Sequence, residues 1–143
     1  MNAEVFIDTN VFLYSLSDDP GEKLKAERAR EILLNENWGW SVQVAGEFFT
    51  TATSLKRQFR LPRSLAREYV DTWLTFPTAA LNSQTVREAL MLVDVFQISY
   101  WDASIIASAS ALGCRRLYSE DLSDGQNYDG VQVINPFPTQ GNK

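Results

Sequence analysis

Short apolar segments with the composition of buried strands alternate along this chain with longer segments of helical spacing. The strand-like segments are residues 5–8, the run WGWSV, residues 79–81, the run CRRLYS and the run VQVINP. The helix-like segments between them include residues 43–56, 61–76, 83–97 and 100–113. This alternation favours an α/β sandwich with a central, mostly parallel sheet of about five strands.

The length of 143 residues fits one domain. We expect this domain to span residues 1–137 and residues 138–143 to be a disordered tail. The one cysteine, Cys114, and the absence of histidine exclude an intramolecular disulfide and a thiolate or imidazole zinc site. The start, MNAEVF, lacks the features of a signal peptide, and no run approaches the ~20 apolar residues of a membrane span. We therefore expect a cytoplasmic protein without a membrane partner.

The net charge of the chain is only a weak argument against a nucleic-acid partner. Thirteen Lys and Arg against 18 Asp and Glu give a formal charge of −5, which on its own disfavours nucleic acid. If several carboxylates gather at one metal site, however, the remaining surface is nearly neutral and can carry basic patches. Overall acidity therefore leaves an RNA partner open.

Four acidic residues stand where local structure alone explains them poorly: Asp8, Glu47, Asp102 and Asp121. Asp102 opens a helix and could simply complement its dipole, and Asp121 follows a strand and could cap a loop. Asp8 directly follows Val-Phe-Ile, and Glu47 stands in VAGEFF. An unpaired buried charge at either position costs several kcal/mol, so a salt bridge to arginine is the structural alternative.

Convergence of the four acids on a cation removes these costs together. Their mutual repulsion would be severe, and Mg²⁺ or Mn²⁺, which prefers carboxylate and water oxygens, relieves it. Such an ion activates water and neutralises charge on a phosphoryl oxygen, so phosphodiester hydrolysis needs no histidine. Thr9, Asn10 and Ser119 are expected to donate hydrogen bonds that orient the carboxylates. Asp8 and Asp121 both follow strands, at the sheet edge where α/β folds bind ligands.

The segments FIDTNVFLY, SVQVAGEFF, YWDASIIASA and LYSEDLSDG with VINPF, in this order, resemble the PIN domain, and within it the VapC-type toxins of bacterial toxin–antitoxin pairs. The resemblance runs from about residue 5 to 137. It implies a PIN-like α/β/α sandwich whose acidic cluster binds magnesium or manganese and cleaves RNA endonucleolytically. By the matching segments, Asp8 and Asp102 are the principal metal ligands and Glu47 and Asp121 the other two acids.

Two details of the last segment stay open at this point. The segment holds two adjacent acids, Glu120 and Asp121; we expect Asp121 to be the site residue, but the sequence does not exclude Glu120. Asp124, three residues later, is either a supplementary acid or a residue of the turn-rich run SDGQNYDG.

The resemblance also implies partners. VapC-type toxins form homodimers and are silenced by a cognate VapB-like antitoxin that occupies the acidic groove. RNA needs basic contacts, and we expect Arg60 and Arg63 in LKRQFRLPR to supply them, whereas Lys56 and Arg57 could equally complement a helix end. The four tryptophans are expected in the core, with NWGW as an alternative exposed patch.

The sequence therefore predicts a metal-dependent endoribonuclease that acts as a toxin. One alternative is a phosphohydrolase with Asp8 as the nucleophile, but such enzymes usually carry a second acid two residues later, where this chain has Asn10. The other is a catalytically inactive PIN-like module that binds RNA or a partner.

Overall fold

A computed structural model describes residues 2–137 of the chain. Its strands are β1 (Val5–Ile7), β2 (Trp38–Ser41), β3 (Thr78–Ala79), β4 (Arg116–Tyr118), β5 (Asn127–Tyr128) and β6 (Val131–Ile134). Its helices are α1 (Thr9–Ser15), η1 (Pro20–Glu22, a 3₁₀ turn), α2 (Lys23–Asn35), α3 (Val42–Ala52), α4 (Arg63–Trp73), α5 (Ser83–Phe96) and α6 (Tyr100–Ala111). The predicted tail, residues 138–143, lies outside the described residues.

The strands form one sheet in the order β3-β2-β1-β4-β6-β5. All neighbouring pairs are parallel except β5 with β6, so the predicted α/β fold with a mostly parallel sheet is confirmed. The sheet has a sixth strand because β5 forms within the run expected to be a turn-rich loop. The helix predicted over residues 43–56 is also shorter than expected, since α3 ends at Ala52.

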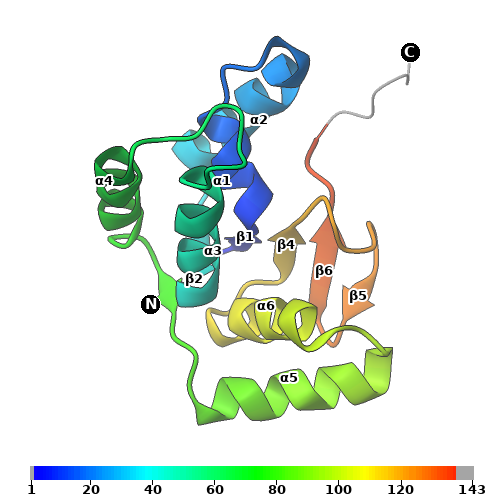
Figure 1. Cartoon of the computed structure of the whole chain (residues 1–143). Helices are drawn as coiled ribbons and strands as arrows, with labels where there is room; N and C mark the ends of the chain where they lie inside the picture. Colours follow the sequence, from blue (N-terminus) through cyan, green and yellow to red (C-terminus); the bar gives the residue numbers. More distant parts are fainter. Residues whose placement is uncertain (1, 138–143) are drawn as a thin grey trace, which may run out of the picture.

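Helices flank the sheet in two groups (Figure 1). Figure 1 shows α5 and α6 grouped apart from α1, α2, α3 and α4, with strands between the groups. Helix α6 is buried from Ala103 to Ala109 because it packs against both the sheet and α5. Gly39 of β2 permits this packing, since a Cβ there would lie 2.8 Å from a Leu112 methyl carbon and 3.0 Å from the Pro77 carbonyl oxygen.

An aromatic cluster fills the core beside α1. Phe12 lies 4.9 Å from Trp40 and 4.8 Å from Trp73 between ring centroids, and the Trp38 ring stacks on Phe76 at 4.1 Å. Trp38, Trp40 and Trp73 are buried, as predicted, so NWGW forms no exposed patch. Trp101 is different: it is 61 % exposed, and its prediction as a core residue was wrong.

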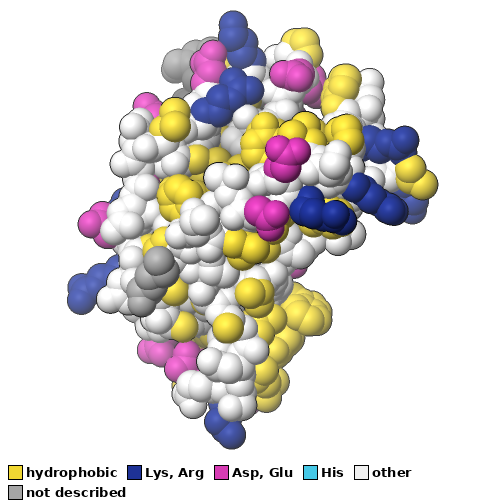
Figure 2. Space-filling model, turned by 90° about the vertical axis from the view of Figure 1, so that its left-hand side faces the viewer, with side chains coloured by type: hydrophobic (Ala, Val, Ile, Leu, Met, Phe, Trp, Pro, Cys, Tyr) yellow, Lys and Arg dark blue, Asp and Glu magenta, His cyan; other side chains and the backbone are white. Residues whose placement is uncertain are grey.

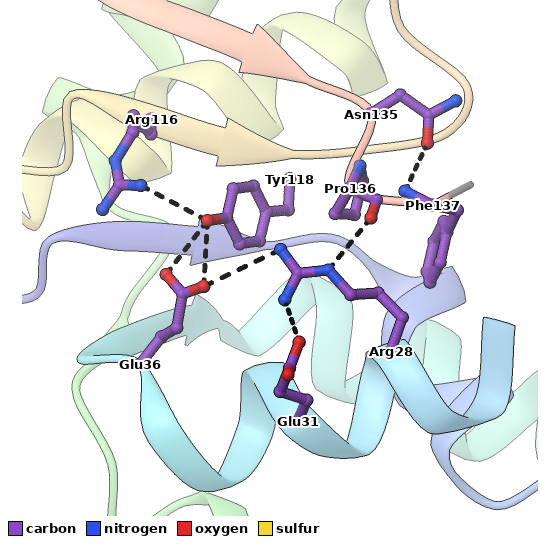
Figure 3. A network of polar contacts seen from close by, with 8 residues as sticks. All are labelled: Arg28, Glu31, Glu36, Arg116, Tyr118, Asn135, Pro136 and Phe137. Atoms are coloured by element: carbon purple, nitrogen blue, oxygen red, sulfur yellow. Dashed lines mark hydrogen bonds and ion pairs between the residues drawn. The ribbon is translucent and has the colours of Figure 1, made fainter. Parts of the chain in front are cut away.

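A polar network fixes the end of β4 against α2 and the segment after β6 (Figure 3). The Tyr118 hydroxyl donates to the Glu36 carboxylate at 3.0 Å, and Arg28 reaches Glu36 at 4.0 Å. The Arg28 Nε donates to the Pro136 carbonyl oxygen at 3.1 Å. Burial and the hydrogen bond to Glu36 raise the pKa of Tyr118. The network therefore holds the strand end that leads directly into Ser119.

None of the helices formed by residues 2–137 has the length and apolar character needed to cross a membrane.

Candidate active site

Asp8 lies where β1 ends and α1 begins. Its backbone N–H donates to the Tyr118 carbonyl oxygen at 3.1 Å, which sets the ends of β1 and β4 side by side. Its carboxylate accepts from the Thr9 N–H at 2.7 Å and from the Ser119 hydroxyl at 2.9 Å. Burial, and to a lesser extent the nearby carboxylates of Asp121 and Glu47, raise the pKa of Asp8 to about 6 despite these two hydrogen bonds. Asp8 is thus a desolvated acid facing two other acids.

Two residues of α1 connect Asp8 to those other acids. The Thr9 hydroxyl donates to Glu47 Oε1 at 2.8 Å, and Asn10 Nδ2 donates to Asp121 Oδ2 at 3.1 Å. Because Thr9 and Asn10 follow Asp8 directly, the first turn of α1 holds carboxylates that come from α3 and from the loop after β4. We call Asp8, Glu47 and Asp121 the acidic row.

Ser119 joins the row to the loop after β4. Besides donating to Asp8, its oxygen accepts from the backbone N–H groups of Asp121 at 3.2 Å and Leu122 at 3.3 Å. The side chain is buried, so these bonds are shielded from water. One hydroxyl therefore sets both the Asp8 carboxylate and the backbone that carries Asp121.

Glu47 differs from what the sequence predicts. We expected this glutamate to be partly buried among apolar neighbours, but it is exposed, because Val44 and Phe48 face the core and Glu47 faces solvent. Its carboxylate is nevertheless held from both sides, since Gln43 Nε2 donates to Oε2 at 3.2 Å. The structure thus places Glu47 in the row through hydrogen bonds rather than through burial.

Asp102 lies at the start of α6, where its N–H donates to the Ser99 hydroxyl at 3.1 Å. Gln43 Nε2 lies 3.5 Å from the carbonyl oxygen of the preceding residue, Trp101, and so links this helix start to Glu47. Among the described residues, no hydrogen bond joins the Asp102 carboxylate itself to the acidic row. Asp102 therefore lies beside the row but is not tied into it.

The adjacent acid Glu120 is engaged elsewhere. Its carboxylate accepts from the Tyr14 hydroxyl at 2.7 Å and forms an ion pair with Lys25. Burial alone would raise the pKa of Glu120, but the bonds from Lys25 and Tyr14 outweigh it, and the pKa lies below its usual value. This geometry favours Asp121 over Glu120 as the acid of the row.

The other predicted residues lie around this site. Asp124 Oδ1 accepts from the Asn135 N–H at 2.9 Å, which favours the turn role over a supplementary acid. Arg60 is exposed in the connection between α3 and α4, and Arg63 is exposed at the first position of α4. Figure 2 shows Lys and Arg side chains close to acidic ones on the face that carries α3 and α4. The two arginines remain predicted RNA contacts.

The donors of the row suit a hard divalent cation. They are carboxylates, and Asp121 Oδ1 accepts no hydrogen bond from any described residue. Within residues 2–137, however, no three acidic or cysteine side chains are gathered closely enough to hold an ion as they stand. The residue types thus fit Mg²⁺ or Mn²⁺, and binding requires the carboxylates to move together.

Sequence reasoning missed three residues of this site: Gln43, Tyr14 and Lys25. Gln43 and Tyr14 had a usable signal, because each stands four positions from a site residue on the same helix, Glu47 and Asn10 respectively. Lys25 had none, since it is 95 residues from Glu120 in the chain.

Comparisons with known proteins identify the family and the fold that carry this site. The PIN domain family matches residues 5–123. A toxin–antitoxin complex from Klebsiella pneumoniae shares 16 % identity over 95 % of this chain and 100 % of that one, with a TM-score of 0.68. Comparison with the curated proteins found no sequence relative.

Two further solved structures are similar in fold. VapC20 of Mycobacterium tuberculosis, a Sarcin-Ricin loop cleaving toxin, shares 17 % identity over 82 % of this chain and 90 % of that one, with a TM-score of 0.64. The DNA-bound VapBC of Salmonella typhimurium shares 15 % identity over 92 % of this chain and 96 % of that one, with a TM-score of 0.63. At these identities the likeness concerns the fold.

Proposed function

Because this chain belongs to the PIN domain family, we propose that it is an endoribonuclease dependent on Mg²⁺ or Mn²⁺ and the toxin of a toxin–antitoxin pair. The observation that carries the proposal is the acidic row: three carboxylates from separate elements, held at the edge of the sheet by Thr9, Asn10 and Ser119. A desolvated acid facing two others is costly unless a cation joins them.

The residues of the row have distinct roles in this proposal. A divalent ion, when bound, lowers the pKa of water and neutralises charge on a phosphoryl oxygen. Asp8 and Asp102 would be the principal ligands of this ion, and Glu47 and Asp121 would be the other two acidic ligands. Thr9, Asn10 and Ser119 orient the carboxylates of Glu47, Asp121 and Asp8 through their hydrogen bonds.

The toxin role is supported by the names of the solved structures that are similar in fold. The Klebsiella structure is, by its name, a toxin–antitoxin complex, and the Salmonella structure is VapBC bound to DNA. We extend this to a VapB-like antitoxin for the present chain, which would block the acidic row. Copurification of the chain with the product of a short neighbouring gene, and loss of cleavage in that complex, tests this partner.

Homodimer formation stays a prediction of the resemblance, and α5 offers a surface for it. Leu90 and Val95 are 52 % and 63 % exposed, and Val86 and Met91 of the same helix are exposed as well. Light scattering on the purified protein tests the dimer, and Leu90→Asp should shift its mass to that of a monomer. A monomeric parent protein would contradict the prediction.

The function itself is tested by cleavage of total RNA with mapped ends. Cleavage should require added Mg²⁺ or Mn²⁺, stop in excess EDTA and resume when the metal is restored. Asp8→Asn should be inactive throughout while its circular dichroism matches that of the parent chain. Full cleavage in EDTA, or by Asp8→Asn, would contradict the proposal.

Two other functions make different predictions. The inactive-module alternative draws on the separation of the carboxylates, and it predicts RNA binding without cleavage under any metal condition. The aspartyl-nucleophile alternative is disfavoured, because Asn10 donates to Asp121 where a second acid would be needed. Trapping a phosphorylated Asp8 would support that alternative.

A further inference from the structure

A groove runs between α1 and the connection from α3 to α4. It encloses about 360 Å³, which is in the range of small-ligand sites, and it is open to solvent. One wall carries Asn10 and Tyr14 of α1, and the opposite wall carries Arg57, Gln58 and Phe59. None of the last three residues has a role in the acidic row.

The groove begins at the acidic row. Asn10 lines it and donates to Asp121, and Tyr14, one helical turn later, lines it and donates to Glu120. An RNA strand with one phosphodiester at the acidic row can therefore continue directly into the groove across this face of α1.

Arg57 provides the groove with an available positive charge. Its side chain is half-buried and forms no hydrogen bond or ion pair with any described residue. Asp19 and Glu22 also line the groove, but neither forms an ion pair with Arg57: Asp19 accepts from the Gly21 N–H at 2.9 Å and Glu22 from the Ser17 hydroxyl at 2.6 Å. An anion in the groove would therefore find Arg57 free.

Phe59 provides an aromatic face. Its side chain is 52 % exposed although it lies within reach of the apolar core. An exposed aromatic ring beside a free arginine is the pairing that binds single-stranded nucleic acid, by stacking on a base and by contact with its phosphate.

A protein segment fits the groove less well. A helix or strand from a partner needs pockets for apolar anchor side chains. The apolar hollow next to the groove, lined by Leu16, Phe48 and Leu61 among others, has a volume of only about 10 Å³. That is room for about one water molecule, not for a side chain.

We propose that this groove binds one unpaired nucleotide of the RNA next to the bond that is cut, with its base on Phe59 and its phosphate on Arg57. The proposal rests on the proposed ribonuclease function, because the groove is assigned to the same substrate. It adds Phe59 to a segment where the sequence favoured Arg60 and Arg63, and it gives Arg57, which the sequence left open between RNA and a helix end, a phosphate contact.

The test is the affinity of the full chain for a fluorescein-labelled, unstructured 12-nucleotide RNA, measured by anisotropy in EDTA over a salt series. Phe59→Ala should weaken binding about tenfold at every salt concentration, because base stacking does not depend on counterions. Phe59→Trp should restore the affinity. Arg57→Gln should lower the slope of log K against log salt by about 0.7, the value for one lost phosphate contact on a single strand.

Two control variants isolate the groove. Leu55→Ala removes an 83 % exposed apolar side chain from the same connection outside the groove, and Arg87→Gln removes a charge from α5. Both should bind RNA as the parent chain does. Circular dichroism should show an unchanged fold for all variants, since Phe59 is half-exposed and Arg57 has no described partner.

The outcomes separate this proposal from the ribonuclease function. If the chain cleaves RNA and the Phe59 and Arg57 variants keep both their affinity and the salt slope, the groove proposal is overturned and the function stands. If the variants bind as expected but no metal supports cleavage, the function fails and the groove stands. Loss of antitoxin binding with unchanged RNA binding would also overturn the proposal.

Discussion

The acidic row and the groove beside it share helix α1 but are built in opposite ways. In the row, Asp8 is desolvated and tied by hydrogen bonds to Thr9 and Ser119, next to the buried ends of β1 and β4. In the groove, Arg57 and Phe59 stand on a connection, with side chains that no described residue binds by hydrogen bonds. In the proposed function, this difference lets the core fix the carboxylates that hold the ion, while an exposed segment binds the substrate.

The largest expected effect is at Asp8. Replacing it by Asn removes a principal donor to the ion, and cleavage should fall by on the order of a thousandfold or more, since such an ion contributes several kcal/mol. Rates are measured on a labelled RNA under single-turnover conditions. If Asp8→Asn retained a tenth of the parent rate, the acidic row could not be assigned to chemistry and the groove to binding.

The same substitution should stabilise the metal-free protein. The folded state holds the Asp8 proton up to pH about 6, against an ordinary value of 3.8, so stability from Asp8 is fully present below pH about 3.8 and lost as the pH rises through 6. Asp8→Asn stays neutral, and its free energy of unfolding at pH 8 should exceed that of the parent by about 1–3 kcal/mol. Urea denaturation in EDTA measures this; a less stable variant at pH 8 would contradict it.

Ser119→Ala should lower kcat by about 10- to 100-fold, the usual cost of losing a group that orients metal ligands. The KM for RNA should stay near the parent value, because the groove is untouched. Ser123→Ala, in the same loop but exposed, is the matched control. A rise in KM with unchanged kcat would show that Ser119 serves binding rather than chemistry.

Lys25 acts between the two regions, because its partner Glu120 accepts from Tyr14 in the wall of the groove and directly precedes Asp121 of the acidic row. Lys25→Met should lower kcat a few-fold and the free energy of unfolding by about 1 kcal/mol, as for a partly exposed ion pair with a hydrogen bond. Lys25→Arg should recover most of both. Failure of the arginine variant to recover kcat would argue against a positioning role.

The smallest effect is expected for the free energy of unfolding when Phe59 in the groove is replaced. Phe59→Ala should change the free energy of unfolding by less than about 0.5 kcal/mol, because the side chain is already half in water. Thermal and urea unfolding check this. A loss of 2 kcal/mol or more would mean that Phe59 is part of the core, and the contrast between the two regions would disappear.

Much of the fold follows from local pattern. The apolar run before Asp8 and the small-residue segment of α6 predicted a strand and a helix correctly, because each pattern is local in the sequence. On α5, by contrast, Val86 and Leu90 have helical spacing yet are exposed, and Thr85, Ala89 and Leu92 face α6 instead. Spacing identifies a face of a helix but not what covers it.

The site was predictable where residues adjoin in the chain and unpredictable where they meet only in space. Thr9 and Asn10 follow Asp8 directly, so their place beside it could be predicted. The ion pair of Lys25 with Glu120 depends on how α2 meets the loop after β4, which no local pattern encodes. The two-residue strand β5 was missed because its Asn-Tyr sequence lies among turn residues.

The central claim is that the acidic row is a divalent-metal site without histidine, and calorimetric titration of the purified chain with Mn²⁺ tests it most directly. The parent chain should bind Mn²⁺ with a measurable heat, and Asp8→Asn should bind at least about tenfold more weakly. Asp124→Asn, whose carboxylate is engaged by Asn135, should bind as the parent does. A parent chain that binds no Mn²⁺, or equal binding by Asp8→Asn, would contradict the claim.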